Sequence, residues 1–129
     1  MGGEGCAVHF AAANDYPPGA YRAFLEPFCE NHEVIASLHR PLWEAPPEIE
    51  SFRSWDVLGE DVGELVSQLQ QPVISVGHSM GTAAILMAAV KRPELFKSLV
   101  LIEPVIVPRR YLLGMSFFRR FRPEVIPLV

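Results

Sequence analysis

The sequence predicts an α/β fold, in which helices flank a mostly parallel sheet of about four strands. The first observation behind this prediction is an alternation along the chain between short apolar runs of strand length and longer segments with helical periodicity. The second is the composition: 129 residues, 50% of them apolar and 20% charged, suffice for one domain with a buried core. Because helices connect the strands, right-handed crossovers and a parallel sheet are expected.

Four apolar runs have the length and composition of buried strands. They comprise residues 7–12, 34–38, 72–77 and 98–102. The last two are rich in β-branched side chains, which fit a pleated and buried surface. We therefore expect these runs to form the sheet.

Three segments between the strands have helical character. In residues 56–70 the apolar positions recur at helical spacing, and acidic residues are enriched in the first turns, where the helix dipole favours them. Residues 79–91 form an alanine-rich pattern that a proline ends. Residues 21–31 are expected to form a helix that Pro27 limits or kinks, and the proline-rich stretch 39–55 is expected to be a long loop.

Charge is distributed unevenly along the chain. Residues 1–108 carry six Lys and Arg side chains against 14 Asp and Glu, whereas residues 109–129 carry five arginines against one glutamate. An acidic body repels a phosphate backbone, so no nucleic-acid partner is expected. No apolar stretch reaches the roughly 18 to 20 residues that a bilayer requires, so a membrane location is not expected.

Cysteine usage and the N-terminal sequence bear on compartment and cofactors. Cys6 and Cys29 are too few for a disulfide scaffold, and their spacing does not match a zinc site. The start MGGEGC has neither the basic nor the apolar region of a secretory signal, so a cytoplasmic location is expected. The phosphate-binding and dinucleotide-binding motifs are not matched either, so no cofactor and no metal are expected.

The pattern Gly-x-Ser-x-Gly occupies residues 77–81, between the expected strand 72–77 and the expected helix 79–91. A strand that turns directly into a helix strains the backbone of the serine, and small residues on either side let the chain cross itself closely. Ser79 would then stand above the carboxyl ends of the strands, at the positive N-terminus of the helix. The amide of Met80 can point at a developing oxyanion. The pattern thus indicates Ser79 as a nucleophile, the alternative being an ordinary glycine-rich turn.

The sequence SVGHSMGTAAILMAA around this serine resembles the nucleophile elbow of the α/β-hydrolase fold family. A second segment, residues 9–28, is similar to that family's third strand and oxyanion loop, with Asn14 and Asp15 in place of the His and Gly of its HGxP motif. The resemblance implies that the backbone amides of Met80 and Tyr16 are the two oxyanion donors. Asp15 departs from the usual glycine, which costs strain if the position requires a positive φ.

The resemblance covers about residues 7–107 and only about half of such a domain. It implies an incomplete α/β-hydrolase fold, whose core is residues 1–108 and whose residues 109–129 begin a cap or lid segment. It also implies an order of strands across the sheet, namely 34–38, 7–12, 72–77 and 98–102. For the basic and apolar tail, a membrane-surface helix and a partner-binding helix are the alternatives to a cap.

The family's triad runs Ser, then Asp or Glu, then His, and no histidine follows Ser79. The histidines present are His9, His32, His39 and His78. His9 is expected to be a structural residue inside a strand, His78 to line the pocket or pack beside the helix, and the other two to lie on the surface or in loops. Glu103 follows the strand at 98–102, where some family members place the triad acid; a turn-capping or pocket-lining role is the alternative.

The sequence therefore predicts the central portion of a serine-dependent, esterase-like acyl hydrolase that lacks the base of its nucleophile, and the chain alone is expected to be nearly inactive. The parent enzyme would act on a small ester-like molecule. The alternative is a non-catalytic α/β binding module in which the turn at residues 77–81 has only a structural role. Strands 34–38 and 98–102 would be left as apolar edges, which favours self-association.

Overall fold

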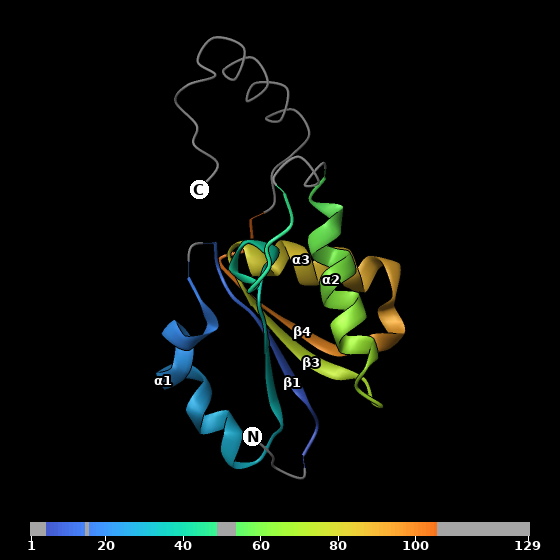
Figure 1. Cartoon of the computed structure of the whole chain (residues 1–129). Helices are drawn as coiled ribbons and strands as arrows, with labels where there is room; N and C mark the ends of the chain where they lie inside the picture. The colour runs from blue at the N-terminus through green and yellow to red at the C-terminus, as the bar shows by residue number, and fades with distance from the viewer. Residues whose placement is uncertain (1–4, 15, 49–53, 106–129) are drawn as a thin grey trace.

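The structure is a computed structural model that describes residues 5–14, 16–48 and 54–105 (Figure 1). Its strands are β1 (Val8–Ala11), β2 (Val34–Ser37), β3 (Val73–His78) and β4 (Phe96–Ile102). They form one sheet in the order β2-β1-β3-β4, and every neighbouring pair is parallel. The predicted parallel sheet and the predicted strand order are both confirmed.

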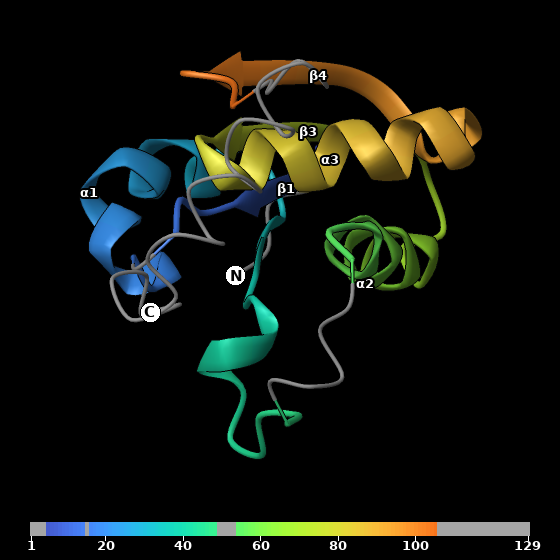
Figure 2. The same ribbon diagram turned by 90° about the horizontal axis from the view of Figure 1, so that it is seen from above.

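Helical segments cover both faces of this sheet. α2 (Asp56–Ser67) and α3 (Met80–Lys91) pack against each other and against one face. α1 (Arg22–Leu25) lies on the other face, so that the sheet separates it from α2 (Figure 1, Figure 2). The predicted helices at residues 56–70 and 79–91 correspond to α2 and α3, and the fold class is confirmed as α/β.

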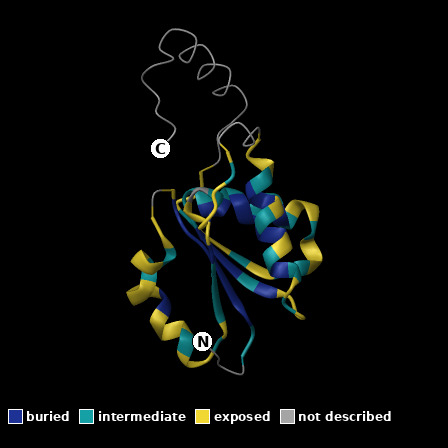
Figure 3. Cartoon of the chain, viewed as in Figure 1, coloured by how far each residue is buried: buried dark blue, intermediate teal, exposed yellow. Residues whose placement is uncertain are grey.

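β1 is the strand that both layers bury, and all four of its residues are buried (Figure 3). Successive side chains of a strand point to opposite faces. Phe10 therefore packs with Leu25 on the α1 side, whereas Ala11 belongs to the cluster formed with α2 and α3. The small side chain of Ala11 leaves room for α3 to approach the sheet closely.

The segment predicted as one helix over residues 21–31 is divided into three turns. Only α1 is α-helical, and the 3-10 turns η1 (Pro18–Tyr21) and η2 (Glu26–Glu30) flank it. Pro27 has no N–H to donate and its ring clashes with the carbonyl of the preceding turn, so an α-helix cannot run through it. The predicted limit at Pro27 is confirmed, but the helix is shorter than the expected range of residues 21–31.

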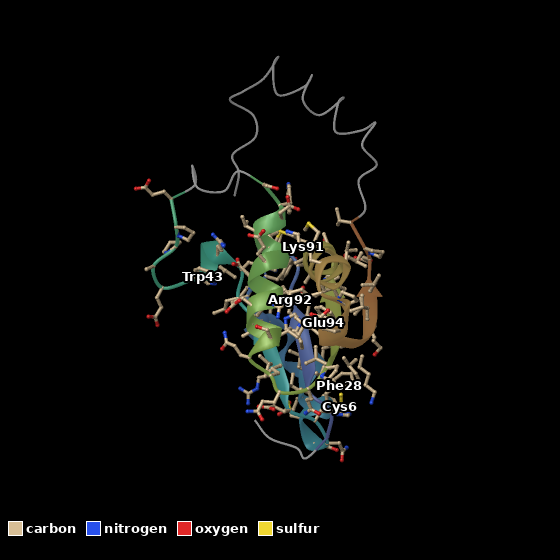
Figure 4. All side chains as sticks on the ribbon, turned by 90° about the vertical axis from the view of Figure 1, so that its right-hand side faces the viewer. Cys6, Phe28, Trp43, Lys91, Arg92 and Glu94 are labelled. Carbon is tan, nitrogen blue, oxygen red and sulfur yellow. The ribbon has the colours of Figure 1, made fainter. Side chains whose placement is uncertain are left out.

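An arginine–aspartate pair joins the loop after β2 to α2. The loop contains a 3-10 turn, η3 (Arg40–Leu42), within the stretch predicted to be irregular. Arg40 Nε and Nη2 donate to Asp61 Oδ2 and Oδ1 at 2.7 and 2.8 Å, and this hydrogen bonding raises the pKa of the guanidinium. The guanidinium also lies 5.5 Å from the ring centroid of Trp43, on the same loop (Figure 4). Asp61 therefore ties the loop to the helix, whereas only Asp56 supplies an acidic charge in the first turn of α2.

His9 lies at the centre of the sheet with its side chain fully buried. Its Nδ1 is 2.6 Å from Ser75 Oγ on β3, and its Nε2 is 3.1 Å from Ser37 Oγ on β2. Burial lowers the pKa of this imidazole to about 4, with a smaller contribution from the nearby His39. The structural role expected of His9 agrees with this environment.

The chain should lose stability as the pH falls from about 6.5 to about 4, because unfolded His9 takes up a proton there that the folded core excludes. Above pH 6.5 His9 is neutral in both the folded and the unfolded chain, so it causes no loss in the free energy of unfolding there. The loss by pH 4 should be about 3 kcal/mol, and urea unfolding at a series of pH values measures it. His9→Gln should flatten this dependence, whereas His32→Gln should retain it. An NMR titration of His9 with a midpoint near 6.5 would contradict the prediction.

Candidate active site

Ser79 lies between the end of β3 at His78 and the start of α3 at Met80. Its backbone has φ 51° and ψ −115°, a conformation that residues with a side chain rarely adopt. Such strain persists only where the surrounding structure imposes it, and it is concentrated at functional sites. The strand, the turn and the helix were all predicted from the sequence, and the strained serine between them is what that prediction requires.

Two glycines make this turn sterically possible. A Cβ on Gly77 would lie 2.8 Å from Thr82 N and Cα, where the first turn of α3 passes over the strand. A Cβ on Gly81 would lie 2.1 Å from the carbonyl oxygen of Ala11 and 2.7 Å from that of Ala12. These neighbours are backbone atoms, which cannot move aside as a flexible side chain can. Both positions of the motif are therefore restricted to glycine by the crossing of the chain.

Backbone hydrogen bonds fix Ser79 on both sides. Its N–H donates to the carbonyl of Ile102, at the end of β4, at 2.9 Å. Its carbonyl accepts from the N–H of Thr82 at 3.0 Å, and also from the Thr82 hydroxyl. Thr82 is fully buried, so this anchor is held inside the core. The turn thus presents Ser79 at the carboxyl ends of the parallel strands, as expected.

The predicted oxyanion donors lie on the two segments that meet at this turn. Met80 is the first residue of α3, and the amides of a helix's first turn have no acceptor within the helix. Tyr16 lies beyond β1, and its N–H makes a long hydrogen bond of 3.4 Å to the carbonyl of Ala13. Asp15, expected to cost strain in this loop, lies outside the described residues. The roles of the Met80 and Tyr16 amides stay predictions.

His78 makes hydrogen bonds through both ring nitrogens. Its Nδ1 is 2.7 Å from the hydroxyl of Tyr21, and its Nε2 is 3.3 Å from Glu103 Oε2. The Tyr21 hydroxyl in turn accepts from the N–H of Ala13 at 3.2 Å. Across the described part of the chain, no hydrogen bond joins a histidine to the Ser79 hydroxyl. Both ring nitrogens of His78 are therefore engaged with groups other than Ser79.

Glu103 has the second positive φ among the non-glycine residues described, 48°. It follows β4 directly, and its carboxylate is exposed apart from its contact with His78. The two strained residues, Ser79 and Glu103, come at the carboxyl ends of the neighbouring strands β3 and β4. A turn-capping role for Glu103 does not account for the contact between its carboxylate and the imidazole.

The remaining two histidines bind backbone carbonyls. His32 Nδ1 lies 2.9 Å from the carbonyl of Cys6, and His39 Nε2 lies 2.9 Å from that of Ala12. His39 belongs to a loop, as predicted, but it is buried and not at the surface. Its bond to Ala12 holds the loop after β2 against the end of β1, which explains the burial. Neither residue contacts Ser79.

Sequence reasoning missed Tyr21, because 57 residues separate it from His78 and no motif joins them. The segment that contains Tyr21 was expected only to pack as a helix. The aromatic cluster around it becomes apparent only in the fold, where the rings of Phe10 and Tyr21 lie 4.7 Å apart and those of Tyr21 and His78 lie 5.7 Å apart. This contact could be found only from the placement of β1 beside β3.

Neither a metal site nor a membrane span is found in the described part of the chain. No three side chains of His, Cys, Asp or Glu gather there in a way that could hold a metal ion. No helix within the described ranges has the length and apolar character needed to cross a bilayer. The predicted cap segment at residues 109–129 lies outside these ranges.

A family model described as the alpha/beta hydrolase fold matches residues 40–126, more than half of the chain. The chain belongs to the α/β-hydrolase fold family. The match begins in the loop after β2 and includes the whole of the turn at Ser79. A comparison with curated proteins found no match.

Solved structures similar to this α/β-hydrolase chain share its fold at low sequence identity. A thioesterase domain from the curacin biosynthetic pathway has a TM-score of 0.76 and 20% identity, over 92% of this chain and 45% of that one. An epoxide hydrolase from Vigna radiata has a TM-score of 0.78 and 22% identity, over 92% of this chain and 40% of that one. The chain thus spans less than half the length of these two structures, in agreement with the partial fold that was predicted.

Gly81→Ala should destabilise the protein by about 2 kcal/mol or more, because its Cβ would collide with the carbonyls of Ala11 and Ala12. Urea or thermal unfolding measures the loss. Gly19→Ala is the matched control, since a Cβ at Gly19 meets nothing within 4 Å, and it should change stability by less than about 0.5 kcal/mol. Equal stability of the two variants would contradict the close crossing of α3 and β1.

Proposed function

We propose that this α/β-hydrolase chain carries the nucleophile of a serine-dependent, esterase-like acyl hydrolase, with Ser79 as that nucleophile. The observation that supports the proposal most is the strained backbone of Ser79, φ 51°, at a turn from strand to helix that two sterically restricted glycines permit. A turn with only an architectural role would gain stability from a glycine at this position, because glycine adopts positive φ without strain. A serine kept there at a cost points to use of its hydroxyl.

The proposed chemistry is acyl transfer through an ester on the enzyme. Ser79 Oγ attacks a substrate carbonyl carbon while its proton passes to a general base, which in the chain alone is solvent water, and the carbonyl oxygen becomes an oxyanion. The amides of Met80 and Tyr16 would donate hydrogen bonds to that oxygen. The protonated base returns that proton to the leaving alkoxide as the carbon–oxygen bond breaks. Water then attacks the acyl-enzyme, and its protons end on the released acid and on the restored serine hydroxyl.

The chain offers this serine no base of its own in the described residues. Both nitrogens of His78 have other partners, His9 is enclosed between Ser75 and Ser37, and His39 binds a carbonyl. Without a base, a serine hydroxyl at neutral pH is a weak nucleophile. We therefore propose that the chain alone has very slow turnover. In the fold family the base follows the nucleophile along the chain.

Small molecules with a reactive carbonyl are the proposed substrate class. The solved structures with this fold include a thioesterase domain and an enzyme described as degrading N-acyl homoserine lactones, which has 18% identity and a TM-score of 0.71. An excess of acidic over basic residues in the body of the chain supports a partner other than nucleic acid. The two free thiols, Cys6 and Cys29, support a reducing, cytoplasmic environment.

A fluorophosphonate probe should modify the chain once, at Ser79, and intact-mass measurement followed by peptide mapping detects the adduct. Labelling needs only a single reaction per molecule, so it is expected even where hydrolysis of a p-nitrophenyl ester is barely above background. Ser79→Ala should abolish the adduct. Ser98→Ala, which removes an exposed serine from β4, should label as the wild-type chain does.

Two results would contradict the proposal in different ways. No adduct on a folded chain would favour the non-catalytic binding module over the hydrolase. Fast ester hydrolysis that Ser79→Ala abolishes would show that a base is present after all, and the expectation of slow turnover would then be wrong.

We further propose that the chain associates with itself through β4. This strand pairs only with β3 in the described sheet, and its apolar side chains are partly exposed, Val100 to 46% and Leu101 to 37%. An open apolar edge of this kind pairs readily with another strand. The exposure of β4 also supports pairing with a complementary piece of a hydrolase fold.

Light scattering coupled to size exclusion should give a mass above the 14.4 kDa of one chain, rising with concentration. Val100→Lys should lower the mass toward that of a monomer, because a charge on the edge opposes pairing. Val90→Lys is the control: Val90 is 83% exposed on α3, away from the edge, and its variant should associate as the wild type does. A sharp monomer at every concentration would contradict this proposal.

A further inference from the structure

A chain of hydrogen bonds connects the end of β4 to the loop that follows β1. Glu103 Oε2 lies 3.3 Å from His78 Nε2, His78 Nδ1 lies 2.7 Å from the Tyr21 hydroxyl, and that hydroxyl lies 3.2 Å from the N–H of Ala13. The contacts join three segments that are distant in sequence: β4, the turn around Ser79, and the loop that contains Tyr16. The proposed mechanism does not use any of these four groups directly.

The chemistry of the groups sets the direction of every bond in this chain. The carboxylate of Glu103 can only accept, so Nε2 of a neutral His78 must carry the proton and donate it. Nδ1 is then an acceptor, and the Tyr21 hydroxyl donates to it. The same hydroxyl has lone pairs left to accept from Ala13 N–H. A neutral imidazole therefore fits only as the Nε2–H tautomer.

The ends of the chain are fixed by different means. The Tyr21 ring packs against Phe10 of β1, with centroids 4.7 Å apart, so its hydroxyl cannot move far from the end of that strand. Glu103 has a strained backbone, φ 48°, immediately after Ile102, whose carbonyl accepts from Ser79 N–H. In this conformation its carboxylate lies within hydrogen-bonding distance of the imidazole beside Ser79.

We propose that Glu103, His78 and Tyr21 form a positioning relay that holds the loop after β1 against the turn at Ser79. Glu103 sets the tautomer and orientation of His78, His78 fixes the Tyr21 hydroxyl, and Tyr21 holds the amide of Ala13, three residues before Tyr16. None of the three residues takes the proton of Ser79. The effect of the relay on the reactivity of Ser79 rests on the proposed function, whereas its effect on the loop does not.

Two direct measurements test the relay in the full chain without any turnover. Long-range ¹H–¹⁵N NMR should show the wild-type His78 as the Nε2–H tautomer, and Glu103→Ala should convert it to a mixture. Amide exchange at Ala13 should become about 5-fold faster in Tyr21→Phe, the change expected when one hydrogen bond is lost. Exchange at Ala13 should also be faster in Glu103→Ala than in the wild type. Glu103→Gln keeps an acceptor oxygen, so its exchange rate at Ala13 should lie between those of Glu103→Ala and the wild type.

Glu94→Ala is the matched control for Glu103→Ala. Glu94 is an exposed glutamate that pairs with Arg92 at 3.7 Å, beyond the C-terminal end of α3 (Figure 4). It should leave the His78 tautomer and the Ala13 exchange at their wild-type values. A His78 that stays Nε2–H in Glu103→Ala, or an Ala13 exchange rate that Tyr21→Phe does not change, would overturn the relay.

The rate of fluorophosphonate labelling connects the relay to the nucleophile. In Glu103→Ala and Tyr21→Phe the first-order labelling step at Ser79 should slow about 5-fold, with the affinity for the probe unchanged. A labelling step as fast as that of the wild type would overturn the role of the relay at the nucleophile. Absence of labelling in every protein, together with the expected tautomer and exchange changes, would contradict the proposed function and support the relay.

Discussion

The close crossing of α3 over the end of β1 is the constraint on which the site depends. The backbone of Gly81 lies against the carbonyls of Ala11 and Ala12, and no side chain fits between them. This contact fixes where α3 begins, and so it forces the reversal at Ser79 that leaves the serine with a positive φ. Ser79 and the loop after β1 are therefore placed by backbone packing. The side chains of Tyr21 and His78 add hydrogen bonds between these segments.

β1 transmits this constraint through the rest of the fold. It is buried on both faces, and on the α3 side its one alanine, Ala11, allows the helix to approach. His9 adds side-chain hydrogen bonds across the sheet, to Ser75 on β3 and to Ser37 on β2. Buried polar groups that are fully satisfied favour one arrangement of their neighbours over others. The register of β2, β1 and β3 is thus fixed by hydrogen bonds between side chains as well as by the backbone ladder.

The sequence was sufficient for features that depend on local pattern. The strands, the helices α2 and α3, the turn at Ser79 and the strand order follow from periodicity, glycine spacing and the family resemblance. It was insufficient where distant segments decide the outcome. The contact of His78 with Tyr21, the burial of His39 and the pairing of Asp61 with Arg40 each join residues more than 20 positions apart. The interruption of the helix before Pro27 is a local effect that the sequence did predict, because proline lacks the N–H that an α-helix needs.

The hydrogen bond from Ser79 N–H to the carbonyl of Ile102 ties the strained turn to an edge strand. Edge strands open more easily than interior ones, and local openings of this kind occur well below the free energy of global unfolding. When the end of β4 frays, the turn loses its anchor and the backbone of Ser79 can relax into an ordinary conformation. The strained geometry of Ser79 would then disappear while the core around Phe10 and Ile85 is still folded. A strand that pairs with the edge of β4 would oppose this fraying, and Ser79 would then keep its strained backbone conformation over a wider range of temperature and denaturant.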